Sequence, residues 1–413
     1  MLTGRGKWTI GVGLALYVVA WGFGTTALFP VATGLVAAPL IALGWVRFMR
    51  QPMRMRRRTE PVELVEGGTV AVRVEVRPDA GTVPAQGMLV ERIVGVQERV
   101  VQLRRQGYVL HGAYELRGAP RGRFTLEARE VTFDDPFGLA EVAIDVHRAD
   151  TLLVYPRISR LDGLFSDTGA ASGDEGRALL HRTAGYDLHS IRDFQQGESL
   201  RRVHWRSTAK RRKLMVKELI ETPRDEAAVL LDADRMAVAG PRGASSFDEQ
   251  VRAAASLLQR MVSLGQRCSL VVHGASRQRF RIQAGGGEWA GVMAALAAVE
   301  PDAERPLASM LRDLVSGSGA AESVDAARLF VVTAAPSPGL SDRLLALRSS
   351  RRDVALVWVD APTYAGRETR PGPEQAATLQ LAAAGIPVAR LVAGGDVAGA
   401  LSATAIRKEA VHA

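Results

Sequence analysis

Two long uncharged runs at the start of the chain constrain its fold more than any other feature. Residues 8–24 and 25–46 contain no Asp, Glu, Lys or Arg. As a helix, the first run would be ~26 Å long at about 1.5 Å per residue, close to the thickness of a bilayer's hydrocarbon core. Backbone in lipid must satisfy its own hydrogen bonds, which a helix does. The two runs therefore predict a transmembrane helical hairpin, in which Pro30 and Pro39 are tolerated.

Basic residues flank this hairpin on both sides. Arg5 and Lys7 precede the first run, and residues 47–58 hold six arginines and no acid. The positive-inside rule then places both ends in the cytoplasm, which predicts a multi-pass protein of the cytoplasmic (inner) membrane with its soluble domains facing the cytoplasm. A cleaved signal peptide is the alternative for the first run. The second run follows at once, without a small-residue cleavage site between them, and this disfavours the alternative.

The net charge of +9 comes from two short blocks, residues 47–58 and 201–213, while the remainder is mildly acidic. The first block is expected to touch anionic lipid headgroups. The second contains a single tryptophan and lacks the interleaved aromatic residues of a base-stacking platform. We therefore expect the membrane lipid bilayer as a partner and no nucleic acid.

Residues 59–155 have the texture of antiparallel strands. Short alternating runs such as TVAVRVEVRP and RFTLEAREVTF are separated by Gly and Pro, which predicts a β-sandwich-like domain. The sequence DDPFGL at residues 134–139 stands out as a turn where a strand pair ends, and its aromatic residue Phe137 is predicted to be buried.

Residues 224–413 alternate apolar runs with stretches of helical spacing. The predicted strands are 227–232, 267–273, 279–283, 328–333, 353–360 and 386–392. This alternation predicts an α/β domain with a mostly parallel sheet, whose ligands bind at the carboxyl ends of the strands. Cys268 lies in an apolar run and is predicted to be a buried, reduced thiol.

Residues 185–210 are densely charged around a few aromatic side chains. Guanidinium and carboxylate groups in such a set can close a network of charge-assisted hydrogen bonds, which predicts a structural or partner-binding role. As an alternative, His204 beside an acid could act as a general base, although no Ser or Cys nucleophile accompanies it in a recognisable turn. The candidate residues are Gly185, Asp187, Arg192, Asp193, Phe194, Gly197, Glu198, Arg202, His204, Trp205, Ala209 and Lys210.

DDPFGL, together with this downstream pattern, resembles the membrane-anchored bacterial proteins of the domain of unknown function 58 family; Arg202 or its neighbour Arg201 fills one arginine position of the pattern. The resemblance implies a C-terminal domain similar to von Willebrand factor A domains. It also implies a MoxR-type AAA+ ATPase as partner, with a membrane transglutaminase-like protein as a possible companion.

Von Willebrand A domains bind magnesium through Asp-x-Ser-x-Ser after their first strand. Here Asp232 matches, Asp234 replaces the first serine, and Met236 replaces the second with a thioether that suits a hard cation poorly. Ala334 stands where a further acid is expected. We therefore predict a degenerate ion-site loop at Asp232 and Asp234 and no bound metal, with magnesium kept as an alternative. The two acids could instead cap a helix or pair with Arg235.

Four segments follow: a hairpin with a basic cytoplasmic flank (1–58), a β-sandwich-like domain (59–155), a linker with the central charged motif (156–223) and a von Willebrand A-like domain (224–413). The sequence has no Gly-x-x-x-x-Gly-Lys-Ser/Thr loop for ATP phosphates. We predict a non-enzymatic membrane-anchored adaptor that works through protein–protein interaction with the ATPase in cell-envelope protein assembly or maturation. A membrane-associated hydrolase using His204 and a magnesium-dependent protein-binding module are the alternatives.

Overall fold

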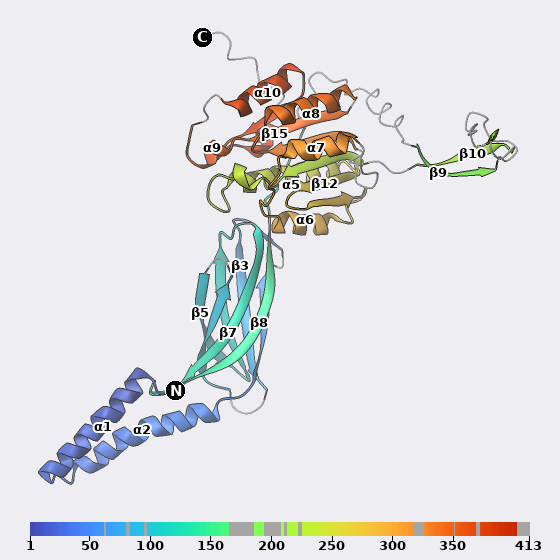
Figure 1. Cartoon of the computed structure of the whole chain (residues 1–413). Coiled ribbons are helices and arrows are strands. Elements are labelled where there is room, and N and C mark those ends of the chain that lie inside the picture. The colour runs from blue at the N-terminus through green and yellow to red at the C-terminus, as the bar shows by residue number, and fades with distance from the viewer. Residues whose placement is uncertain are drawn as a thin grey trace. The chain divides into compact units, whose positions relative to one another are not determined.

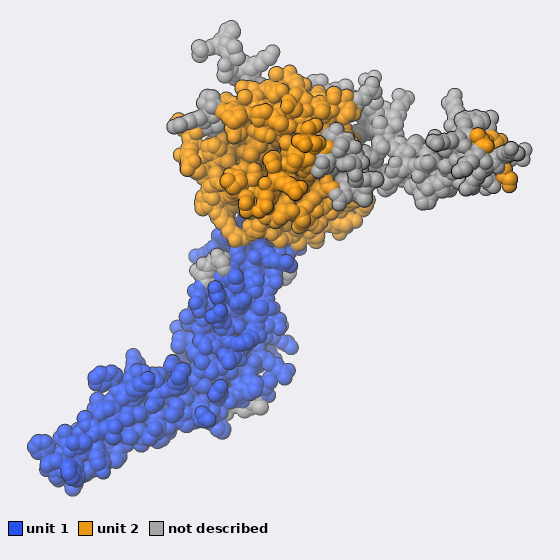
Figure 2. All heavy atoms as spheres, in the orientation of Figure 1, with its two compact units in different colours: residues 1–155 blue, residues 156–413 orange. Residues whose placement is uncertain are grey.

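The computed structural model describes two compact units, Met1–Tyr155 and Pro156–Ala413 (Figures 1 and 2). Each unit is treated separately below. The described residues are 1–61, 63–79, 83–94, 97–164, 186–193, 208–209, 213–221, 225–316, 326–350, 352–368 and 372–402.

The first unit begins with the predicted pair of apolar helices, α1 (Gly4–Phe23) and α2 (Leu28–Phe48). Thr3 caps α1 by accepting a hydrogen bond from Gly6 N, and Gly24 ends it in the left-handed conformation with φ 66°. A short turn over Gly24–Ala27 makes α2 start later than predicted. The helices pack where Gly13 meets Ala32, since a Cβ atom at Gly13 would lie 3.1 Å from the Ala32 oxygen. By length and composition, both helices suffice to cross a bilayer.

The rest of this unit, the β unit, is one mixed sheet of eight described strands. Their order is β1-β3-β6-β5-β4-β7-β8-β2, and β2–β8 is the parallel pair among antiparallel ones. The strands are β1 (Met53–Glu60), β2 (Leu64–Val65), β3 (Thr69–Pro78), β4 (Gln86–Ile93), β5 (Gln97–Gln106), β6 (Val109–Arg117), β7 (Gly122–Asp134) and β8 (Glu141–Tyr155).

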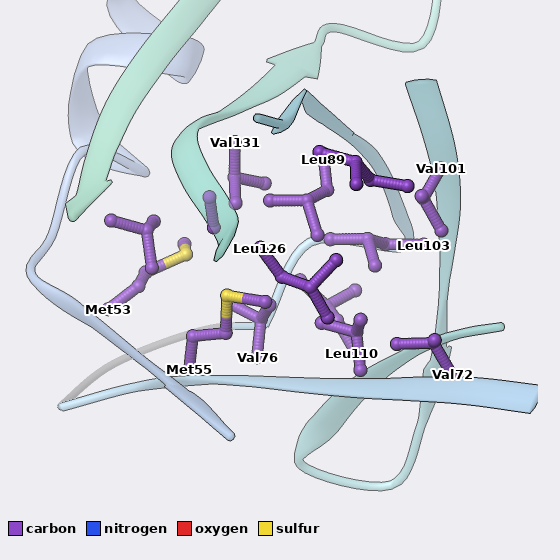
Figure 3. Close-up of a cluster of buried hydrophobic side chains, with 14 of the residues drawn as sticks. Met53, Met55, Val72, Val76, Leu89, Val101, Leu103, Leu110, Leu126 and Val131 are labelled. Carbon is purple, nitrogen blue, oxygen red and sulfur yellow. The ribbon is translucent and has the colours of Figure 1, made fainter. Parts of the chain in front are cut away.

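A β-sandwich-like domain is the prediction, and the strands form one continuous sheet folded over its own core. The two leaves join through β5 and β6, which pair only at their turn, from Arg104–Gln106 to Val109–His111. Beyond that turn, β5 continues beside β4 and β6 beside β3. Side chains from both leaves meet in the core, among them Val72, Leu103 and Leu126 (Figure 3). The short pairing of β5 with β6 at their hairpin therefore joins the two leaves into one sheet.

The sheet begins before residue 59, the predicted start of the β-sandwich-like domain. β1 starts at Met53, so the second half of the arginine block is a strand of the β unit. Its apolar side chains Met53 and Met55 are 8% and 6% exposed, and Arg57 is buried in an ion pair described below. The buried methionines alternate with arginines, which is the two-residue period of a strand with one buried face. The high charge of the block conceals this alternation in the sequence.

The second unit is an α/β unit around a mixed sheet of order β13-β12-β11-β14-β15-β16. β13 pairs antiparallel with β12, and the other described pairings in this sheet are parallel. The strands are β11 (Asp225–Asp232), β12 (Cys268–His273), β13 (Arg277–Ile282), β14 (Ala326–Thr333), β15 (Asp353–Val359) and β16 (Val388–Leu391). Cys268 is fully buried, as predicted.

Helices cover both faces of this sheet (Figure 1). α7, α8 and α10 share one apolar core with β14 and β15, while α5 packs on the sheet outside that core. α5 starts with a capping box, in which Ser245 Oγ accepts from Asp248 N at 3.1 Å and Asp248 Oδ2 accepts from Ser245 N at 3.2 Å. The described helices are α5 (Ser246–Ser263), α6 (Trp289–Ala298), α7 (Leu307–Ser316), α8 (Pro338–Ser349), α9 (Ala361–Tyr364), α10 (Pro373–Ala383) and α11 (Val397–Ser402).

The start of the predicted linker belongs to this unit. Ser159 N donates to Ser256 Oγ of α5 at 2.9 Å, and Arg260 donates to the Asp162 carbonyl at 2.9 Å. Further along, β9 (Tyr186–Asp193) and β10 (Met215–Glu221) form an antiparallel pair with an irregularity between Glu218 and Leu219.

Candidate functional site

The carboxyl ends of the parallel strands bring several polar residues to one edge of the α/β sheet. β11 ends at Asp232, its neighbour β14 ends at Thr333, and Asp360 directly follows β15. Asp232 also pairs in register with His273 at the end of β12. Because parallel strands end at the same edge, these residues lie at the edge where α/β sheets bind their ligands.

Asp232 is a buried carboxylate at this edge of the sheet. Its side chain is held by Thr333 Oγ1, which donates to Asp232 Oδ2 at 2.6 Å, while Oδ1 has no hydrogen-bond partner among the described residues. Burial raises the pKa of Asp232 to about 6, and the Thr333 hydrogen bond and the nearby His273 act in the opposite direction. Proton uptake by Asp232 is therefore favoured at mildly acidic pH.

Asp234 has a local structural role. Its Oδ1 accepts from Met236 N at 2.8 Å and so caps the short 3-10 turn Arg235–Ala237. Arg235 pairs with Glu304 at 3.3 Å. Asp234 therefore caps a turn, which is one of the two predicted alternatives to ion binding. Arg235, the predicted pairing partner of these acids, pairs with Glu304 instead.

The donor set does not fit a magnesium ion. Only Asp232 and Asp234 of the loop carry carboxylates, Met236 is 83% exposed, and Ala334 offers no side-chain oxygen. No group of three or more His, Cys, Asp or Glu side chains that could hold a metal occurs among the described residues. Magnesium prefers near-octahedral oxygen coordination, and two carboxylates, one of which already caps a turn, do not supply it.

Asp360 forms the second polar centre of the edge. Its side chain is fully buried and its Oδ2 accepts from Arg390 Nε at 3.1 Å and Nη2 at 2.5 Å. The Arg390 guanidinium also lies 5.1 Å from the centre of the Trp358 ring. A two-nitrogen contact to a carboxylate plus an aromatic face fixes the position of the arginine.

A pocket of about 280 Å³ opens at this edge, with Asp360 in its wall. Its wall combines carboxylates, one indole ring and small apolar side chains. It is lined by Asp234, Met236, Ala237, Ala334, Ala335, Trp358, Asp360, Ala361, Pro362, Glu374 and Gln375. Glu374 and Gln375 come from the first turn of α10, and Ala361 and Pro362 come from α9, so the start of each helix adds to the wall beside the strand ends.

The predicted central motif is only partly described. Asp187, Arg192 and Asp193 lie in β9, where Asp193 pairs in register with Met215 and Arg192 with Val216, and Ala209 is exposed in a short helical turn. The remaining motif residues lie outside the described residues: Gly185, Phe194, Gly197, Glu198, Arg202, His204, Trp205 and Lys210. The predicted clamp and the predicted base at His204 therefore stay predictions.

Sequence reasoning missed several residues of the pocket edge. Thr333 and Asp360 could have been found, because each is a polar residue directly after an apolar run that was predicted as a strand. Arg390, Trp358 and Glu374 gave no such signal, since their place depends on β16 and α10 lying beside β15.

Comparison with known proteins gives a family match for part of the chain. Residues 190–363 match a family model described as "Protein of unknown function DUF58". This range includes Asp232, Thr333 and Asp360, and it confirms the resemblance found in the sequence for that part of the chain. The uncharacterized protein YeaD of Bacillus subtilis (strain 168) is 28% identical over 201 residues, which cover 49% of this chain and 48% of YeaD. The match thus spans about half the length of that relative.

Similarity to solved structures is low. Proximal thread matrix protein 1 of the mussel byssus matches with 12% identity and a TM-score of 0.23, over 33% of this chain and 38% of the matrix protein. Cwp6 from Clostridium difficile matches with 7% identity and a TM-score of 0.20, over 81% of this chain and 49% of Cwp6. TM-scores this low say nothing about the shared fold of either pair.

Proposed function

We propose that this protein is a membrane-anchored adaptor whose α/β unit binds a partner protein at the carboxyl edge of its sheet. The pocket between Asp234, Trp358 and Glu374 is the observation that carries the proposal. The apolar helices α1 and α2 serve as the anchor, crossing the cytoplasmic membrane twice so that both units face the cytoplasm.

The polar contacts of the edge favour binding over catalysis. Asp232 is engaged by Thr333, Asp234 caps a turn, and Asp360 holds Arg390. The residues that line the pocket include carboxylates but no Ser, Cys, His or Lys that could act with them as nucleophile or proton relay. A preformed pocket that combines a few polar groups with apolar side chains suits recognition of a ligand.

The chemistry of the wall favours a basic side chain from the partner. Asp234 and Glu374 bring negative charge to the opening, and Trp358 with Ala334 and Pro362 offers an apolar surface for the stem of a lysine or arginine. Such side chains bury their methylene groups while their charged end pairs with carboxylates. In this proposal the incoming cation takes the place that an ion has in von Willebrand A domains, to which the family resemblance likens the C-terminal domain.

The resemblance to the domain of unknown function 58 family supports the choice of partner. We take the partner to be a MoxR-type AAA+ ATPase, acting in cell-envelope protein assembly or maturation beside a membrane transglutaminase-like protein. The test is affinity purification of the full-length protein from detergent-solubilised membranes, with and without nucleotide, followed by mass spectrometry. Recovery of an AAA+ ATPase in a nucleotide-dependent manner is the expected result.

Two variants connect the partner to the pocket. Asp234→Asn keeps an acceptor for the Met236 amide, and Glu374→Gln keeps the size of an exposed side chain, so both remove charge and little else. Together they are expected to reduce recovery of the ATPase at least tenfold. Asp353→Asn is the matched control, because Asp353 is a half-exposed carboxylate at the start of β15, on the opposite edge of the sheet. If the double variant and the control recover equal amounts of the ATPase, the pocket is not its binding site. If the original protein recovers no AAA+ ATPase with or without nucleotide, the proposed partner is wrong.

A further inference from the structure

Two exposed aromatic side chains stand at one end of the β unit. Phe137 lies in the β7–β8 turn and is 79% exposed, so the prediction that it is buried is wrong. Tyr108 is 86% exposed in the β5–β6 turn. We propose that these two side chains insert into the lipid headgroup region of the membrane that α1 and α2 cross, so that the β unit itself has a lipid-binding surface. The inference rests on the membrane anchoring of the proposed function.

The β7–β8 turn is built to hold Phe137 outward. Asp135 is 4% exposed and its carboxylate accepts from three backbone amides, those of Phe137 at 2.9 Å, Leu139 at 2.6 Å and Ala140 at 2.6 Å. Gly138 takes a φ of 67°, which few other residues adopt. The carboxylate thereby fixes the backbone on both sides of Phe137, so its exposure is a property of a rigid turn.

The same turn is joined to the start of α1 and the end of α2. Thr3 N donates to the Leu139 oxygen at 3.0 Å and Thr3 Oγ1 donates to the Gly138 oxygen at 2.7 Å. A Cβ atom at Gly6 would overlap the carbonyl oxygen of Leu139, so the first turn of α1 lies directly on it. Ala140 packs into a buried cluster with Ala42 and Val46 of α2. Figure 1 shows the N-terminus beside this end of β7 and β8.

These contacts set the depth of the turn relative to the helices. The residues it touches lie at the ends of α1 and α2 that also carry Trp8 and Trp45, which are 77% and 51% exposed. Tryptophan at helix ends marks the boundary between hydrocarbon and headgroups. A turn that packs on Thr3 and Val46 therefore lies at the membrane surface when the helices span the bilayer.

Strand register puts the β5–β6 turn at the same end of the unit. Gln86 pairs with Arg104 at the end of β5, and Met88 pairs with Thr132 at the end of β7. The β5–β6 turn that carries Tyr108 thus projects in the same direction as the β7–β8 turn. Arg104, beside it, is exposed.

The chemistry of this end matches a lipid surface that contains anionic headgroups. Tyrosine and phenylalanine side chains are stabilised at the boundary between acyl chains and headgroups, where an aromatic ring is partly desolvated. Arginine beside them is attracted to anionic lipids. A protein partner covering the same rings is the competing occupant, and the experiment below separates the two.

The test measures depth with a nitroxide attached to single introduced cysteines. Cys268 is fully buried, so the unsubstituted chain is the unlabelled blank. Phe137→Cys and Tyr108→Cys are compared with two reference positions in full-length protein reconstituted into phosphatidylcholine vesicles containing phosphatidylglycerol. Leu14→Cys reports the helix, where Leu14 is 55% exposed, and Val94→Cys reports the opposite end of the β unit, where Val94 is 41% exposed.

The readout is the ratio of collision rates with oxygen, which concentrates in lipid, and with a water-soluble nickel chelate. Positions 137 and 108 are expected to give ratios between those of positions 14 and 94. Ratios equal to that of position 94, with position 14 in lipid, overturn the inference and leave the anchoring intact. A water-exposed position 14 overturns the anchoring itself. Protection of 137 and 108 from both reagents indicates a protein cover and also overturns the inference.

Discussion

Both units bury charged side chains, but they do so in different places. In the β unit, Arg57 of β1 pairs with Glu91 of β4 and Asp150 of β8, and the Arg57 and Glu91 side chains are 2% and 0% exposed. In the α/β unit, Asp232 and Asp360 are equally buried, yet they lie at the ends of strands, and Asp360 lines a pocket there. The first arrangement is closed by neighbouring strands on several sides, and the second is open on one side.

The difference separates a structural use of charge from the ligand-binding use that we propose. The Arg57 pair connects strands from distant places in the sheet, with Tyr114 beside it. Burial and then the Glu91 carboxylate raise the pKa of Tyr114, so its hydroxyl stays neutral. A buried pair of this kind fixes which strands come together. Charges at an open strand end remain within reach of a ligand, which is where α/β sheets bind.

Breaking the closed pair is expected to have the largest effect. Arg57→Met leaves the buried Glu91 carboxylate without its cation, and the free energy of unfolding is expected to fall by about 3–5 kcal/mol. Thermal unfolding of the detergent-solubilised protein measures it. The double variant Arg57→Met with Glu91→Leu is expected to recover most of this loss, because no charge then remains buried. Arg54→Met is the control, since Arg54 is 82% exposed. A loss below 1 kcal/mol for Arg57→Met would contradict the structural role.

Substitution of Asp232 is expected to change the free energy of unfolding by an intermediate amount that depends on pH. The Asp232 pKa of about 6 in the folded state lies above 3.8, the usual value. The unfolded chain therefore releases this proton first as pH rises, and stability is lost between about pH 4 and 6. Asp232→Asn removes the titration and keeps an acceptor for Thr333. It is expected to be more stable than the original chain at pH 7 by up to ~3 kcal/mol, and equally stable near pH 4.

Melting curves at pH 4, 5, 6 and 7 test this expectation. Since His273 and Asp234 also act on Asp232, His273→Gln serves as a second variant that changes the charge opposite the carboxylate. A constant difference between Asp232→Asn and the original chain across this range would show that the carboxylate does not titrate there.

The smallest effect is expected at an exposed pair. Arg328 and Asp353, 2.7 Å apart at the amino edge of the α/β sheet, are 47% and 50% exposed. Arg328→Gln is expected to change the free energy of unfolding by less than about 1 kcal/mol, because water already solvates both charges. The same melting experiment measures it. A larger loss would mean that exposure does not explain the contrast between the two units.

Apolar periodicity alone predicted much of the architecture. The helices α1 and α2 and the six strands β11 to β16 occupy places that their runs of apolar residues indicate. Asp232 was found as a strand-end residue because an acid directly follows AAVLL. These features are local, so a short window of sequence contains the physical cause.

The parts that could not be predicted depend on distant contacts. Arg57 was counted with a surface block, since nothing local distinguishes it from Arg56 or Arg58; only Glu91 and Asp150 on other strands bury it. The pocket likewise needs α10 to begin beside the end of β15. The continuous sheet of the β unit depends on a three-residue pairing at the β5–β6 turn, which alternation does not reveal.

The edge strand β13 has a consequence for how many copies can share one membrane. It carries Arg277, Arg279 and Arg281 at every second position and pairs with β12 on one side. Proteins held on a surface meet each other far more often than in solution, and open strand edges then invite pairing between copies. Repeated arginines along the edge repel a second, identical edge. With the membrane anchoring proposed here, these arginines disfavour joining between the sheets of neighbouring molecules.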